Sequence, residues 1–290
     1  SVWLLFACAS ALFAGLTAVL AKQGVRTTDS TLATALRTPV VLAGAWGMTL
    51  LSGSIRELGQ VDARSLVCLV LSGLATGASW LCYFKALQLG DVSRVAPVDK
   101  MSTVLTVIMA VLLLGESLSA LGAAGLVLVT IGTLLMLRAE DLRALPRALA
   151  GGGGWLLYAL GAALFAALTA ILGKIGIAAV PSDLGTAIRT GVVLVMAWVM
   201  VGVAGRLRGA AHVPRGEMTW ILLSGVATCA SWLCYFRALQ DGPASVVVPI
   251  DKLGVLVSVA FSVLVLHEHV GVRALLGLAV LVVGTIALAL

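Results

Sequence analysis

LSGLATGASWLCYFKALQLG, residues 71–90, returns 152 positions later as LSGVATCASWLCYFRALQDG, residues 223–242. The same offset relates matching residues along the rest of the chain, and no gap has to be opened anywhere. The matched pairs include Trp3 with Trp155, Lys22 with Lys174, Arg37 with Arg189, Trp46 with Trp198, Asp99 with Asp251 and Glu116 with Glu268. Chance does not produce such a register, so the chain consists of two copies of one unit.

The composition is that of a membrane protein. Of the 290 residues, 61% are hydrophobic and 11% are charged, and the mean hydropathy is +1.12. A soluble globular domain has about 25% charged residues, so this chain could not cover a surface that faces water. The same values exclude disordered, collagenous and disulfide-rich chains.

The charged residues and the cysteines indicate neither nucleic-acid binding nor a metal site. The net charge is +6, but the basic residues lie between apolar runs and form no stripe with interleaved aromatic residues. The cysteines lie within apolar runs without CxxC or zinc-like spacing, so we interpret them as buried small hydrophobic residues. They are Cys8, Cys68, Cys82, Cys229 and Cys234. The sequence thus predicts no metal and no cofactor.

Apolar windows of membrane-spanning length occur ten times, since crossing about 30 Å of hydrocarbon takes about 20 helical residues. They are residues 2–21, 31–51, 66–87, 92–114 and 118–137, then 155–173, 184–204, 218–239, 244–266 and 270–290. A polar, glycine-rich linker at 138–154 separates the first unit, 1–137, from the second, 155–290. The predicted fold is therefore an all-α integral membrane protein with ten transmembrane helices in two five-helix repeats.

An odd number of spans per unit has a geometric consequence. The second unit must enter the membrane from the side opposite to the first, so the repeats are inverted. Inverted repeats place a substrate site near the midplane where the two units meet, and rocking one against the other alternates access. The first apolar run lacks a basic n-region and a small-residue cleavage site, so we expect no cleavable signal peptide.

Motifs in both units carry a family resemblance. Each unit has a Tyr-x-x-Ala-Leu motif and a fourth span ending in a glutamate, which follows a glycine in the first unit and His267 in the second. The residues are Tyr83, Ala86, Leu87, Gly115 and Glu116, then Tyr235, Ala238, Leu239 and Glu268. The chain resembles the EamA-type branch of the drug/metabolite transporter (DMT) superfamily, as a fused pair of bacterial or archaeal five-helix units.

The resemblance implies a ten-helix transporter in a bacterial or archaeal cell (inner) membrane. It implies that the first four helices of each half line a central cavity and that the fifth packs outside, and it implies no particular substrate. Relatives are expected to have both termini in the cytoplasm, whereas the distribution of Lys and Arg among the loops predicts both termini outside. The orientation stays open.

Two adjacent charged residues lie inside the fourth and ninth spans: Asp99 and Lys100, matched by Asp251 and Lys252. An ionisable side chain within the hydrocarbon is costly and usually faces a cavity or a partner, so we predict that these residues bind substrate. The alternative is that the helix begins at Pro97, which would make Asp99 an acidic residue of the first turn.

Arg37 and Arg189 are the second candidate pair for substrate binding. Each lies within an apolar window and precedes a threonine, and a guanidinium offers donors suited to a carboxylate or a phosphate. The alternatives are a structural ion pair and snorkelling of the side chain to the membrane interface.

Aromatic residues at i and i+3 form a third candidate set: Trp80 and Tyr83, and Trp232 and Tyr235. They would supply stacking surface in a cavity, and the alternatives are ordinary helix packing and an interfacial aromatic belt.

Four acidic residues are candidates for coupling to protons: Asp99, Asp251, Glu116 and Glu268. The two glutamates end their spans, so pairing across a loop is the alternative. His267 and His269 beside Glu268 lack the HExxH spacing of a zinc helix.

Small residues form a seam on the fifth and tenth spans, through Gly125, Gly132, Gly277 and Gly284. Such a seam is typical of close helix packing. The sequence does not say whether it faces its own bundle or a second protomer, which leaves a homo-oligomer open.

The repeat-matched charges indicate the type of cargo. Basic residues exceed acidic ones among them, which favours an anionic or zwitterionic metabolite. No P-loop is present, so we predict secondary active or facilitated transport, with a small-molecule substrate, the lipid bilayer and a proton as the candidate partners. The alternatives are a flippase or exporter of lipid or amphipathic molecules and, with no HExxH or GxSxG motif, an intramembrane enzyme.

Overall fold

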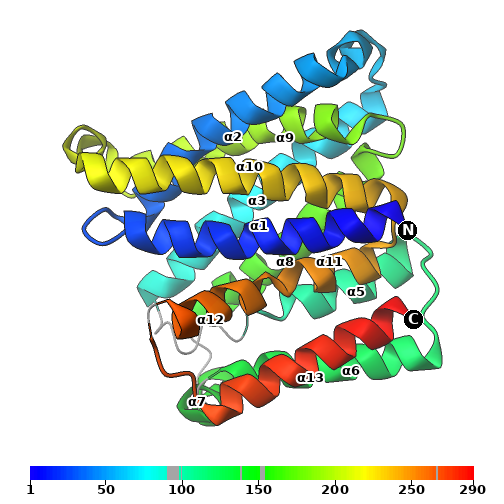
Figure 1. Cartoon of the computed structure of the whole chain (residues 1–290), viewed down its shortest axis with the longest axis vertical. Helices are drawn as coiled ribbons and strands as arrows, with labels where there is room; N and C mark the ends of the chain where they lie inside the picture. The colour runs from blue at the N-terminus through cyan, green and yellow to red at the C-terminus, as the bar shows by residue number, and fades with distance from the viewer. Residues whose placement is uncertain (90–97, 99, 138, 151–153, 266) are drawn as a thin grey trace.

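A computed structural model describes residues 1–89, 98, 100–137, 139–150, 154–265 and 267–290, and the described residues form helices and no strands (Figure 1). The first half contains α1 (Val2–Gly24), α2 (Ser30–Ser52), the short helix η1 (Ser54–Gln60), α3 (Ala63–Leu89), α5 (Ser102–Leu113) and α6 (Ala120–Met136). The second half contains α8 (Gly154–Gly176), α9 (Ser182–Val203), η2 (Leu207–His212), α10 (Arg215–Asp241), α11 (Ala244–Lys252), α12 (Gly254–Leu264) and α13 (Val272–Ala289). Between the halves lies α7 (Ala139–Ala150).

Local signals set the helix ends. The Asp29 side chain accepts a hydrogen bond from the Leu32 amide at the start of α2, and Ser119 does the same for Gly122 at the start of α6. Such caps satisfy amide groups that have no partner within the helix. At the end of α2, Gly53 has a φ of 79°, a left-handed conformation that glycine adopts without steric cost.

Several described helices are able to cross a bilayer. By length and composition there are seven candidate spans, with α11 and α12 counted together as one, and the count rises to eight if α2 and η1, bent by 96°, form one span. α5 and α6 are apolar but shorter, with 12 and 17 residues. The chain is thus a multi-pass membrane protein, while the predicted count of ten spans remains a prediction, partly because residues 92–97 lie outside the described ones.

The ninth predicted span, 244–266, is found as a candidate span over Ala244–Phe261, with a one-residue interruption at Leu253 that divides it into α11 and α12. Pro249 lies inside α11 and lacks the amide proton that a helix interior uses. Gly254 starts α12 against α1, where an added Cβ atom would lie 2.6 Å from the carbonyl oxygen of Ala11. The close approach of the two helices therefore requires a glycine at this position.

Helices from different halves pack in pairs. α1 lies beside α10, α3 beside α8, and α6 beside α13 (Figure 1). α6 ends next to α7, whereas its counterpart α13 ends at the C-terminus on the opposite side of the molecule (Figure 1). The equivalent helices α6 and α13 therefore run in opposite directions, as the predicted inversion of the two units requires.

The glycine seam joins α6 to α13 within the chain. A Cβ atom added at Gly132 would lie 2.7 Å from the carbonyl oxygen of Gly277, and one added at Gly125 would lie 2.6 Å from that of Gly284. The seam therefore faces its own bundle, and it holds the fifth helices together at one side of the molecule (Figure 1).

Candidate functional site

A cavity of about 380 Å³ lies where the two halves meet. Its wall comes from α1, α2 and α3 of the first half and from α8, α9, α10 and α11 of the second. The predicted residues that line it are Arg37, Arg189, Trp80, Trp232, Tyr235, Asp251 and Lys252. One surface therefore gathers predicted residues from both units that lie far apart in the chain, from Arg37 to Lys252.

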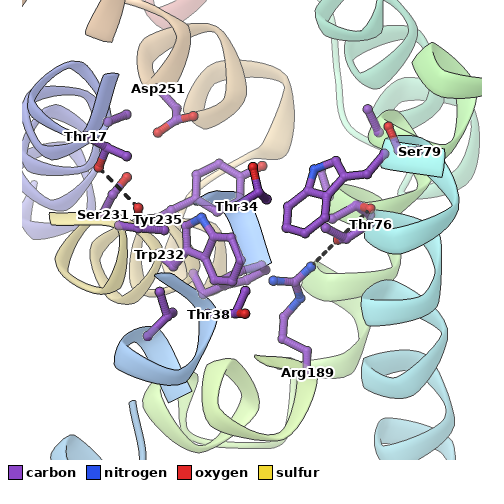
Figure 2. A pocket seen from close by; sticks show the side chains of 18 of the residues that line it. Thr17, Thr34, Thr38, Thr76, Ser79, Arg189, Ser231, Trp232, Tyr235 and Asp251 are labelled. Atoms are coloured by element: carbon purple, nitrogen blue, oxygen red, sulfur yellow. Dashed lines mark hydrogen bonds between the residues drawn. The ribbon is translucent and has the colours of Figure 1, made fainter. Parts of the chain in front are cut away.

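Arg189 is buried in the cavity wall, with 2% of its surface exposed. Its Nη2 donates to the Thr76 hydroxyl at 2.5 Å (Figure 2). Its Nε donates to the Ser72 hydroxyl at 3.2 Å. The guanidinium carbon lies 5.4 Å from the ring centre of Trp232 and 4.7 Å from that of Phe236. Hydroxyl acceptors and aromatic faces thus hold a buried cation that has no carboxylate partner among the described residues.

Arg37, the repeat counterpart of Arg189, is in a different situation. It lines the same cavity, and its Nε is buried without a hydrogen-bond partner. Within the part of the chain that the structure describes, its guanidinium forms no hydrogen bond and no ion pair. A buried donor without an acceptor costs about 1 to 3 kcal/mol of folding free energy. An acceptor that reached the Nε of Arg37 would remove this cost.

Asp251 and Lys252 lie at the end of α11, and both line the cavity. The carboxylate of Asp251 accepts a hydrogen bond from the Ser10 hydroxyl on α1. Lys252 also borders a smaller cavity of about 200 Å³, and Lys100 lies there rather than in the central one. Asp99 lies outside the described residues.

The aromatic candidates divide between the cavity and the protein core. Trp80, Trp232 and Tyr235 line the cavity, and Figure 2 shows the rings of Trp232 and Tyr235 side by side near the guanidinium of Arg189. Tyr83 is not part of this wall. It packs against a small core cluster that includes Ala86.

Glu116 lies at a helix end outside the central cavity. Its two carboxylate oxygens accept the backbone amides of Ala244 and Ser245 at 2.7 and 2.9 Å, so it stabilises the start of α11. The Nζ of Lys174 lies 4.0 Å from the same carboxylate.

Glu268, the repeat counterpart of Glu116, forms an exposed ion pair with Lys22 at 2.9 Å. It also lies outside the central cavity. Both glutamates therefore pair across helix ends in this structure, and neither faces the residues that surround Arg37.

Hydroxyl groups form much of the cavity wall, and the sequence analysis did not single them out. They belong to Thr17, Thr34, Thr38, Thr76, Ser79 and Ser231, which Figure 2 labels, and to Thr169 and Thr228. Most donate to a carbonyl group, as Ser79 does to Ala162 and Ser231 to Ser10 at 2.8 and 3.0 Å. A signal was present in the sequence, because Thr17, Thr76 and Ser79 recur in the second unit as Thr169, Thr228 and Ser231.

The arrangement is suited to binding a small polar solute. Arg37, Arg189 and Lys252 supply positive charge, Asp251 supplies one negative charge, and the hydroxyl groups supply neutral donors and acceptors. A cavity of this size is at the lower end of the range for small-molecule sites. Among the described residues, no group of three potential ligands could hold a metal ion.

Comparison with known proteins agrees with the duplicated architecture. The model of the EamA-like transporter family matches residues 1–138 and again residues 153–290. An uncharacterized transporter in the cobO 3′ region of Sinorhizobium sp. is 46% identical over 134 residues, which are 46% of this chain and 95% of the relative. The relative thus corresponds in length to one of the two units.

Two further similarities are more distant. An uncharacterized protein of Methanocaldococcus jannaschii is 32% identical over 73 residues, which are 25% of this chain and 53% of that protein. A solved crystal structure with 18% sequence identity superposes with a TM-score of 0.78 over 100% of this chain and 99% of its own, which shows a shared fold. Because the family model matches both halves over nearly their whole length, the chain belongs to the EamA-like transporter family of the DMT superfamily.

Proposed function

We propose that the protein is a secondary active or facilitated transporter of a small anionic or zwitterionic metabolite. The solute binds in the central cavity, and the two inverted repeats expose it to the two sides of the membrane in turn. The observation that carries this proposal is the Arg37 guanidinium, which borders the cavity with a buried Nε atom that no described residue accepts. A carboxylate or phosphate oxygen would supply the missing acceptor.

The charge balance of the cavity supports the same class of solute. Its described wall carries three basic side chains and one acidic side chain, so an anion would be attracted to it. A zwitterion could place its carboxylate on Arg37 and its ammonium on Asp251. The rings of Trp80 and Trp232 would pack against the apolar part of the solute.

Transport of a lipid or another amphipathic molecule is the second candidate, and one observation favours it. A groove of about 960 Å³ lies along α2 and α10, and it shares no residue with the central cavity. Its wall is mostly apolar, and Glu57, Asp183 and Arg237 supply charged groups. An acyl chain would fit such a wall, with a headgroup at the charged residues.

Counterflow into proteoliposomes tests the proposal. The purified protein is reconstituted with an unlabelled anionic or zwitterionic metabolite inside, and uptake of the same radiolabelled compound is measured. We expect uptake by the wild type and a loss of at least about tenfold in Arg37→Ala, because a charged hydrogen bond of about 1.5 to 3 kcal/mol is removed. Arg56→Ala is the matched control, since Arg56 is exposed on η1.

Two outcomes would contradict the proposal. Unchanged uptake by Arg37→Ala would show that this guanidinium does not bind the solute. Translocation of a fluorescent phospholipid in the same vesicles, without counterflow of any metabolite, would establish the flippase instead.

A further inference from the structure

The binding partners of Arg189 exist in both copies of the repeat. Arg189 contacts Ser72 and Thr76, and the offset of 152 positions makes Ser224 and Thr228 their counterparts. Thr169, which lies 3.1 Å from Thr76 between the hydroxyl oxygens, has Thr17 as its counterpart. We call Ser72, Thr76 and Thr169 the Arg189 dock, and Ser224, Thr228 and Thr17 the Arg37 dock.

The aromatic neighbours of Arg189 are duplicated as well. The guanidinium of Arg189 lies against the rings of Trp232 and Phe236. Their counterparts in the first unit are Trp80 and Phe84. The chain therefore contains every side chain needed to hold either arginine in the same way.

Only the Arg189 dock is occupied in this structure. In the Arg37 dock, the hydroxyl of Thr228 donates to the carbonyl of Ser224 at 2.8 Å and lies 3.4 Å from the Thr17 hydroxyl. Ser224 donates to the carbonyl of Ile221 at 2.6 Å. Among the described residues no hydrogen bond joins Arg37 to this dock, so two arginines at matching positions of the repeat occupy different environments.

A second pair of repeat-related contacts has the same asymmetry. The side chains of Lys174 and Glu116 are 23% and 11% exposed. The carboxylate of Glu116 accepts a hydrogen bond from the Ala244 amide at the start of α11. Their counterparts Lys22 and Glu268 are 58% and 48% exposed. Among the described residues, the contact between Lys174 and Glu116 is therefore more shielded from solvent than its counterpart between Lys22 and Glu268.

We infer that Arg37 and Arg189 exchange roles during the transport cycle, with Arg189 providing the anion contact in the state that faces the other side. In that state Arg37 lies in its dock against Ser224, Thr228, Trp80 and Phe84, and Arg189 is released into the cavity. The inference rests on the proposed function, which it deepens by assigning one anion-binding arginine to each facing state.

The exchange has a physical reason. A guanidinium buried without acceptors is costly, so a dock stabilises whichever arginine is not bound to solute. The docked guanidinium has its donors directed at hydroxyl groups, while the free one presents its donors to the cavity. The site thus has one available guanidinium in each state, and the inverted repeats make the two states structurally equivalent.

Lysine footprinting of the purified protein tests the exchange without a known solute. The protein is acetylated briefly with acetic anhydride, and the ratio of labelling at Lys22 to labelling at Lys174 is measured by peptide mass spectrometry. The wild type should label more at Lys22, the more exposed of the two. The double variant Ser72→Ala, Thr76→Val should lower this ratio by about tenfold or more, because it removes two hydrogen bonds to a charged group in one of two states.

The matched variant tests the symmetry. Ser224→Ala with Thr228→Val removes the Arg37 dock, which this structure does not use, and should leave the ratio unchanged or raise it. A third readout is modification of Arg37 by phenylglyoxal, which the Ser72→Ala, Thr76→Val variant should suppress although neither substituted residue contacts Arg37. Thr130→Val on α6 is the control, because its hydroxyl donates only to its own helix at Leu126.

Two results would overturn the inference: a ratio that neither double variant changes, or one that both change in the same direction. If a double variant does not fold, the labelling ratio is compared between the single variants Thr76→Val and Thr228→Val instead. Failure of counterflow together with opposite shifts of the ratio would refute the proposed cargo while leaving the exchange in place. Counterflow that depends on Arg37, together with an unchanged ratio, would refute the exchange alone.

Discussion

Single residues show how matching positions of the two repeats come to lie in different environments. The sequence predicted Arg37 and Arg189 as an equivalent pair, because they lie 152 positions apart and each precedes a threonine within an apolar window. Only the coordinates distinguish them, with Arg189 bonded to Ser72 and Thr76 and Arg37 without a described partner. Sequence symmetry cannot say which of two equivalent sites is occupied, since the three-dimensional arrangement breaks the symmetry.

The unpartnered guanidinium of Arg37 predicts a conflict between stability and function. Arg37→Met keeps an apolar stem of similar length and removes a buried donor that lacks an acceptor. We expect the variant to be more stable than the wild type by about 1 kcal/mol, because an unsatisfied buried donor costs about 1 to 3 kcal/mol. The thermal unfolding midpoint in detergent, measured without added solute, should rise.

Arg56→Met is the control for this prediction, since Arg56 is exposed and its loss should leave the midpoint unchanged. A lower midpoint for Arg37→Met than for Arg56→Met would mean that Arg37 supports the fold, and its role as a binding residue would lose its main support.

Helices and their junctions show where sequence patterns are sufficient and where they are not. Hydropathy alone placed α1, α8 and α9 close to their observed bounds, because each is one long and mostly apolar run. The interruption at Leu253 between α11 and α12 was not predicted, since proline and glycine, here Pro249 and Gly254, are also tolerated within continuous transmembrane helices. The helix α7 was also missed, because residues 139–150 are too polar to be read as a span and the adjacent glycines indicated a linker.

The packing of α6 against α13 gives a prediction for these two elements. A Cβ atom at Gly132 would lie 2.6 Å from the backbone nitrogen of Leu281, and the backbone cannot move aside as a flexible side chain could. Gly132→Ala should therefore destabilise the protein by about 1 to 3 kcal/mol through overpacking. The thermal unfolding midpoint should fall.

Gly47→Ala on α2 is the matched control, because a Cβ atom there would meet nothing within 4 Å. It should leave the midpoint unchanged or raise it slightly, since alanine favours a helix more than glycine does. An equal loss in both variants would show that helix propensity or membrane insertion is being measured instead of α6–α13 packing.

At the scale of the whole molecule, the duplication accounts for the arrangement of the two halves. The gapless repeat and the five windows per unit predicted an all-α membrane protein with inverted halves, and the antiparallel course of α6 and α13 agrees with it. The cavity position between the halves also follows from inversion. The hydroxyl lining was not predicted, because Ser and Thr within apolar spans usually bond to their own helix, and their direction depends on how the helices pack.

The charged side chains that line the cavity predict the charge of the transported solute. Counterflow of one radiolabelled anionic metabolite is measured in the presence of unlabelled competitors of similar size that are anionic, zwitterionic, neutral or cationic. The positive excess of Arg37, Arg189 and Lys252 over Asp251 predicts inhibition by the anionic and zwitterionic competitors, and little by the cationic one. Preferential inhibition by the cationic competitor, or transport that ignores solute charge, would contradict the account.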